Sequence, residues 1–156
     1  MKDNFKKIAD FIKNDLPKVV EVEGLKFIAQ NFQDEGFHDG SLQKWKPRKT
    51  TDRKGRDITR YRTDRKGRAG NLNKYGQKNE GRAILTGHNT GGNKLRHSFK
   101  TRSGQNKVVF YTHKESAERH NEGTNGMPKR QFIGKSETLR RSIKKEVERI
   151  LNQLLK

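Results

Sequence analysis

Histidine is the residue type in this chain best suited to acid–base or metal chemistry near neutral pH. Five histidines occur in 156 residues, and His88 and His120 each stand directly before an asparagine, as in fragments of a His-Asn-His nuclease. Such a ββα-metal nuclease usually begins with a paired His-His or Asp-His, which this chain lacks. His113 and His120 are seven residues apart, which is two helical turns rather than the single turn of a helical metal pair.

The remaining parts of a catalytic site are also missing from the sequence. The chain has no cysteine and no clustered carboxylates to complete a metal shell, and it contains no P-loop, dinucleotide fingerprint or nucleophile elbow. We therefore expect no enzyme activity, no metal site and no cofactor. His120 is predicted to be structural, at the end of a short helix, with its side chain bonded to a nearby backbone carbonyl.

Positive charge is the second chemical property of the chain. It has 37 Lys or Arg residues against 18 Asp or Glu residues, a formal net charge of +19. Residues 46–82 alone carry fourteen basic and four acidic residues, and apolar residues are sparse there. A surface of this kind attracts polyanions without sequence preference. The candidate nucleic-acid contacts are Arg53, Lys54, Arg56, Arg60, Arg62, Arg65, Lys66 and Arg68.

A near-repeat lies within residues 46–82. Residues 51–57 read Thr-Asp-Arg-Lys-Gly-Arg-Asp, and residues 63–69 repeat this pattern with Ala in place of the last Asp. Each copy can place its glycine in a turn, which favours a basic hairpin around residues 58–61. With so few apolar residues the segment is expected to be a basic flexible arm that becomes ordered on a partner.

The composition sets the size of the core. The length fits one domain, residues 1–156, and the hydrophobic fraction of 28% predicts a small core. No apolar run is long enough to span a membrane, and the N-terminus has no apolar signal-peptide segment, so we expect a soluble protein that starts in the cytoplasm.

Residues 108–134 form the stretch around which the other elements are expected to pack. Residues 108–113 have the apolar density of a buried strand, and residues 115–122 predict a short helix that ends at Gly123. Pro128 then requires a turn, and Gln-Phe-Ile-Gly at residues 131–134 is a short apolar segment that we expect to pack on the sheet as a strand.

Long helices are predicted at both ends. Apolar spacing indicates a helix from Phe5 that restarts at Asp15 and Pro17 and continues to about Gln33, and another helix capped by Ser136. Between them, residues 37–47 are predicted to be a loop anchored by Trp45, and residues 95–102 and 107–113 a hairpin. The fold class is therefore α+β: a small antiparallel sheet of three to five strands packed by long N- and C-terminal helices.

Several positions recur together in the order of one known family. The motif positions are Phe37, Gly40, Trp45, Pro47, Leu85, Gly87, Leu95, Ser98, Tyr111, Ala117, His120, Gly123, Pro128, Arg130, Phe132 and Gly134. This combination resembles the phage virion morphogenesis family over about residues 30–140. Several polar residues separate Gly87 from Leu95, so that either Gly87 or Gly92 can fill the glycine position of the motif.

The resemblance implies a structural role in tailed phages or prophages. Members of the family complete the tail or join it to the head, and are thought to act as rings. The implied partners are other tail or connector proteins and further copies of the chain, with non-specific DNA contact and no membrane, and the implied location is the virion.

Two other functions are compatible with the residues. One is a non-specific nucleic-acid-binding module that uses residues 46–82, and the other is a metal nuclease, which predicts DNA cleavage dependent on a divalent cation. Charge alone does not separate the first of these from the assembly role.

Overall fold

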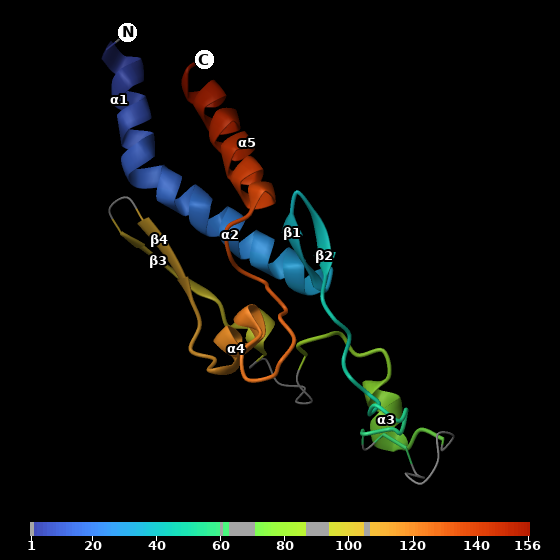
Figure 1. Cartoon of the computed structure of the whole chain (residues 1–156). Helices are drawn as coiled ribbons and strands as arrows, with labels where there is room; N and C mark the ends of the chain where they lie inside the picture. The colour runs from blue at the N-terminus through green and yellow to red at the C-terminus, as the bar shows by residue number, and fades with distance from the viewer. Residues whose placement is uncertain (1, 60, 63–70, 87–93, 105–106) are drawn as a thin grey trace.

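The computed structural model describes residues 2–59, 61–62, 71–86, 94–104 and 107–156. Its elements confirm the α+β class: long helices at the two ends and two small antiparallel hairpins between them (Figure 1). In chain order they are α1 (Lys2–Asp10), a π-helical segment (Phe11–Asp15), α2 (Leu16–Gln33), β1 (Gly36–Asp39), β2 (Ser41–Lys44), α3 (Lys74–Asn79), a 3₁₀ turn (Leu95–His97), β3 (Lys100–Gly104), β4 (Lys107–Tyr111), α4 (Ser116–Glu122) and α5 (Glu137–Leu154).

The N-terminal helix changes direction where the sequence predicts a restart. Pro17 lies in the first turn of α2, where its missing N–H breaks no helical hydrogen bond. The preceding five residues are π-helical, and the Leu16 N–H reaches back to the carbonyl of Phe11. This wider turn joins α1 to α2 through the bend visible in Figure 1.

The four strands among the described residues pair as two hairpins and do not form the single sheet expected from the sequence. β3 pairs with β4, from Lys100 opposite Tyr111 to Gly104 opposite Lys107, which confirms the predicted hairpin; its first strand begins only at Lys100, because residues 95–97 form the 3₁₀ turn. Residues 37–47 were predicted to be a loop, and that prediction is wrong: β1 and β2 pair from Gly36 opposite Lys44 to Asp39 opposite Ser41. Gly40, with φ +72°, turns the chain between them.

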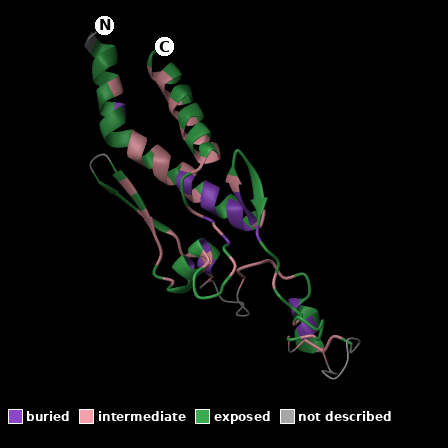
Figure 2. Cartoon of the chain, viewed as in Figure 1, coloured by how far each residue is buried: buried purple, intermediate pink, exposed green. Residues whose placement is uncertain are grey.

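The core lies at the C-terminal half of α2, where the purple residues of Figure 2 gather. Its buried residues come from α2, the end of the first hairpin, the 3₁₀ turn, α4 and the segment after α4: Ile28, Phe32, Trp45, Leu95, Ala117 and Phe132. β4 is a strand as predicted, but it is not buried, because Val109 is 45% exposed and Val108 and Phe110 are half-buried. One face of the β3–β4 hairpin packs on α2, and the other face of the hairpin is exposed to solvent.

α5 is capped by Ser136, whose hydroxyl accepts a hydrogen bond from the Leu139 N–H, as predicted. The helix packs on α2, where the Ser142 hydroxyl donates to the Glu23 carboxylate, and it runs beside α1 to bring the two termini together (Figure 1). No residue of α5 is fully buried, so its apolar stripe is only half covered within the described structure. None of the described helices is long and apolar enough to cross a membrane.

Candidate assembly surface and basic arm

Residues 131–133 are held by side chains rather than by a sheet. The Asn121 carboxamide oxygen accepts hydrogen bonds from the N–H groups of Phe132 (3.0 Å) and Ile133 (3.1 Å). The Phe132 carbonyl accepts from the Asn31 amide at 3.1 Å, and the Trp45 indole N–H donates to the Gln131 carbonyl at 2.7 Å. The predicted strand here is therefore wrong, while the predicted anchoring of Trp45 is confirmed. Buried side-chain amides satisfy the backbone groups that a neighbouring strand would otherwise satisfy.

An aromatic cluster lies beneath this segment. The Phe132 side chain is 1% exposed, and its ring stacks on Phe32 at 5.1 Å and meets Phe99 edge-on at 5.4 Å. Trp45 meets Phe32 edge-on at 5.4 Å between ring centroids. Such contacts add to the free energy of burying the rings, so the segment is fixed by packing as well as by hydrogen bonds.

Gly123 ends α4 in the left-handed conformation, with φ +73°, as the sequence predicts. A side chain here would also lie 2.7 Å from the Lys129 backbone nitrogen, so the glycine allows the chain to fold back closely after the helix. Because the chain folds back after α4, the Arg130 backbone N–H donates a hydrogen bond to the His120 carbonyl at 2.7 Å.

Arg130 is a buried cation that bonds to backbone rather than to a carboxylate. Its guanidinium donates to the carbonyls of Lys46 (3.0 Å) and Pro47 (3.2 Å), where the basic arm leaves the body. Arg48 continues this contact by donating to the carbonyls of Arg82 and Ala83, where the arm returns. We call residues 46–48 and 82–86 the neck. The two guanidiniums hold the two chain segments of the neck together and attach it to the body.

Burial and neighbouring positive charge lower the pKa values of Arg48, Arg130 and His120. Burial is the main cause for both arginines; the Arg82 charge further lowers the pKa of Arg48, and the Arg48 charge further lowers that of Arg130. The pKa of His120 is lowered by burial and then by Arg130, which keeps the imidazole neutral near pH 7. Its predicted bond to a backbone carbonyl is wrong: the ring Nδ1 is buried and has no hydrogen-bond partner among the described residues.

The other motif positions lie around the same core. Phe37 is buried against Phe27, and Leu95 and Ala117 are core residues. The Ser98 hydroxyl contacts that of Thr112 at 2.6 Å. The remaining positions surround this core as half-buried or exposed residues or in turns: Gly40, Pro47, Leu85, Tyr111, Pro128 and Gly134. Gly87 and the alternative Gly92 lie outside the described residues.

The basic arm, residues 46–82, contains local structure that its composition did not predict. Asp52 accepts hydrogen bonds from the backbone N–H groups of Lys54 (2.8 Å) and Arg56 (2.9 Å) and from the Arg56 side chain (2.7 Å). This closes a turn at Gly55, as the repeat predicts, with Thr51 bridged to Asp57, so the predicted hairpin centre at residues 58–61 is wrong. We call residues 50–59 the basic loop.

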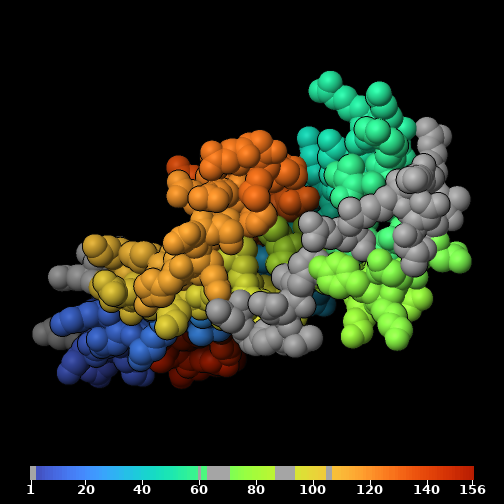
Figure 3. All heavy atoms as spheres, turned by 90° about the horizontal axis from the view of Figure 1, so that it is seen from below, coloured from blue at the N-terminus to red at the C-terminus, as the bar shows by residue number. Residues whose placement is uncertain are grey.

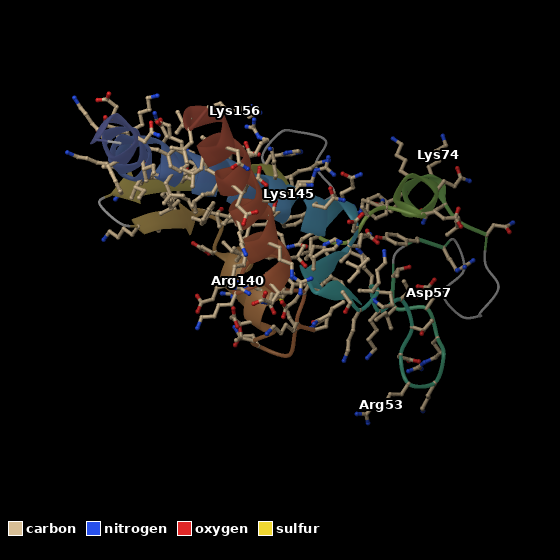
Figure 4. The ribbon with its side chains drawn as sticks, turned by 90° about the horizontal axis from the view of Figure 1, so that it is seen from above. Arg53, Asp57, Lys74, Arg140, Lys145 and Lys156 are labelled. Atoms are coloured by element: carbon tan, nitrogen blue, oxygen red, sulfur yellow. The ribbon has the colours of Figure 1, made fainter. Side chains whose placement is uncertain are left out.

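Figure 4 shows Arg53 at the outer tip of the basic loop and Lys74 on α3, while Arg140, Lys145 and Lys156 follow α5 on the body. Two of the candidate nucleic-acid contacts are used within the arm: Arg56 pairs with Asp52 at 2.7 Å and Arg62 with Asp57 at 3.0 Å. Arg53 and Lys54 are exposed. The others, Arg60, Arg65, Lys66 and Arg68, lie outside the described residues.

Sequence reasoning missed Asn31, Asn121 and Gly24. Asn31 stands within the apolar stripe of α2, and a polar residue at such a position is a signal of a buried hydrogen bond. Gly24 lies inside α2, where glycine is a weak helix former, yet a Cβ there would lie 2.2 Å from the Phe110 ring. The glycine therefore lets β4 approach α2.

Two negative observations complete the description of the site. No group of three or more His, Asp or Glu residues that could hold a metal ion occurs among the described residues. Comparisons of the chain with protein-family models, with curated proteins and with solved structures found no match.

Proposed function

We propose that this chain is a structural morphogenesis protein of a tailed phage or prophage, which completes the tail or joins it to the head. In this role it acts as a ring of copies bound to neighbouring tail or connector proteins in the virion, and no catalytic step is involved. The proposal begins with the resemblance of the motif positions to the virion morphogenesis family.

One observation carries the proposal furthest: motif segments more than 80 residues apart in sequence bind one another directly. The Trp45 indole donates to Gln131, and Arg130 donates to the carbonyls of Lys46 and Pro47. Because the motif residues bond to one another and pack around one core, their chemistry supports a scaffold for protein contacts. The low apolar content, 28%, is also compatible with a protomer that buries more surface on assembly.

The test is genetic complementation in the phage or prophage that encodes the chain. Inactivating the gene should leave separate heads and tails in electron micrographs, and the wild-type gene should restore joined particles that contain the chain by mass spectrometry. Normal infectious particles without the protein would overturn the proposal.

A second candidate function is non-specific nucleic-acid binding by the arm, which the exposed Arg53 and Lys54 favour. DNA binding of this kind should weaken by about 10³-fold or more between 50 and 200 mM salt if six or more phosphates are contacted. Arg53→Ala and Lys54→Ala should each reduce the slope of the logarithm of the DNA-binding constant against the logarithm of the salt concentration by about one, and Lys145→Ala on α5 is the matched control.

If these two variants still join heads to tails but fail in DNA transactions, the arm has a separate role. If the loss of DNA binding alone abolishes phage growth, the nucleic-acid function replaces the assembly function.

A further inference from the structure

A groove of about 470 Å³ lies between β4 and α4. Apolar side chains form its floor: Phe99, Phe110, Ala117, Phe132 and Ile133. Phe99, Phe110 and Ile133 are only half-buried, so apolar surface is open to an incoming side chain. Figure 3 shows the face on which α4 and the turn after it (orange) lie against the β3–β4 region (yellow).

The rim of this groove is acidic in a chain of net charge +19. Glu115, Glu118 and Glu122 all line it and are exposed, and their spacing of three and four residues places them on one side of α4. None of the three forms an ion pair with another described residue; the Asn121 amide bonds to Glu122. Lys114 and His113 also line the groove, so its rim has an excess of negative charge. An apolar floor with an acidic rim fits a basic segment that carries an apolar side chain.

The basic loop has the complementary chemistry. Ile58 is 54% exposed although its N–H is bonded to the Thr50 carbonyl, so its side chain projects from an ordered backbone. Arg53, Lys54 and Arg56 are exposed on the same loop. Because Asp52 already closes the loop, little conformational entropy would be lost on binding.

The neck keeps the basic loop away from the groove of its own chain. Arg130 and Arg48 bond the neck to the body and close it. Figures 1 and 3 both show the arm extending to the end of the molecule opposite the β3–β4 hairpin. A loop and a groove that match but lie far apart on one chain can meet between two copies.

We propose that the basic loop of one copy binds the acidic groove of a second copy, with Ile58 on the apolar floor and Arg53 and Lys54 against the glutamates of α4. This contact uses different surfaces on the two copies, so it continues from copy to copy and closes into a ring or extends as a filament. The inference rests on the self-assembly part of the proposed function.

The experiment mixes two variants that carry complementary defects. Ile58→Asp damages the loop and leaves the groove intact, whereas Glu115→Lys with Glu118→Lys damages the groove and leaves the loop intact. These positions are exposed, so both variants should keep the far-UV circular dichroism spectrum and the Tm of the wild type. Leu155→Asp, an exposed apolar position on the body, and Glu148→Lys, an exposed acid on α5, are matched controls.

Sedimentation velocity of the purified full-length chain measures the result. The wild type and both controls should form oligomers, and each defective variant alone should raise the Kd of self-association about tenfold or more. An equimolar mixture of the two defective variants should form a 1:1 dimer that grows no further, because it contains one intact loop and one intact groove.

Three results would overturn the contact: a wild type that stays monomeric, defective variants that associate like the controls, or a mixture that stays monomeric. Binding of an unrelated basic peptide to the groove of a wild-type chain that stays monomeric would assign the groove to another protein. Sedimentation velocity measures this contact alone, whereas genetic complementation tests the proposed function. The proposed contact can therefore fail while the proposed function stands, and the reverse.

Discussion

The body and the basic arm of this chain are stabilised in different ways. In the body, a small set of aromatic residues packs at the end of α2, and buried amides of Asn31 and Asn121 bond to backbone groups far away in sequence. In the basic loop, the hydrogen bonds accepted by the Asp52 and Asp57 carboxylates come from residues at most five positions away. The buried apolar residues are concentrated in the body, and the basic loop of the arm is shaped by local polar contacts. Damage to the body should therefore unfold the protein, while damage to the arm should stay local.

The largest effect is expected for Phe132→Ala. Its ring is 1% exposed and contacts Phe32 and Phe99, so its removal leaves a cavity that costs about 3 kcal/mol of the free energy of unfolding. Urea denaturation followed by circular dichroism measures it. Ile58→Ala, a truncation at an exposed arm position, is the control and should stay within about 0.5 kcal/mol. A similarly small change for Phe132 would show that the body does not depend on this ring.

Asn121→Ala should have the second largest effect. The carboxamide oxygen accepts from the N–H groups of Phe132 and Ile133, and both would lose their partner, at a cost of about 2 kcal/mol. Asn152→Ala, on the exposed face of α5, is the matched control. Equal stability of the two variants would mean that solvent replaces the amide and that residues 131–133 are not fixed by it.

Gly24→Ala tests the contact between α2 and β4. Alanine normally favours a helix over glycine by about 1 kcal/mol, but the new methyl group would overlap the Phe110 ring, and overpacking costs about 1–3 kcal/mol. We expect a net loss of about 1 kcal/mol, and this loss should turn into a gain in the background of Phe110→Ala. A stabilised single variant would show that the β3–β4 hairpin moves freely away from α2.

The smallest effect is expected on the arm and depends on pH. Hydrogen bonds from the Arg56 backbone and side chain lower the pKa of Asp52 below its usual value of 3.8. The carboxylate therefore stabilises the closed loop above that value, and this contribution is lost as the pH falls through the lowered pKa. The protection factors of the Lys54 and Arg56 amides, which correct for the intrinsic pH dependence of exchange, should fall in acid while those of α2 stay high.

Asp52→Asn is the control for this titration, since it should remove the pH dependence of the protection factors at Lys54 and Arg56. Simultaneous loss of protection in α2 and in the loop would indicate that arm and body unfold as one unit and would remove the distinction between them.

Local sequence signals determined much of the fold. The restart at Pro17, the helix end at Gly123 and the cap at Ser136 depend on neighbours within about one helical turn, and all three are where the sequence predicts them. The β3–β4 hairpin is also confirmed, because its strands adjoin in the chain. The first hairpin was missed because residues 36–44 contain few apolar residues, although Asp39-Gly40 is a turn signal.

Tertiary structure decided how distant groups combine. Nothing near Asn31 or Asn121 in sequence indicates that their amides bond to residues 132 and 133, and nothing near Arg130 indicates that its charge is held by the carbonyls of the neck. Backbone carbonyls and N–H groups occur at every residue and leave no trace in residue type, so their partners can be found only when the chain is folded. The charge of the arm follows from composition alone, whereas the match between its loop and the acidic groove requires the folded positions of both.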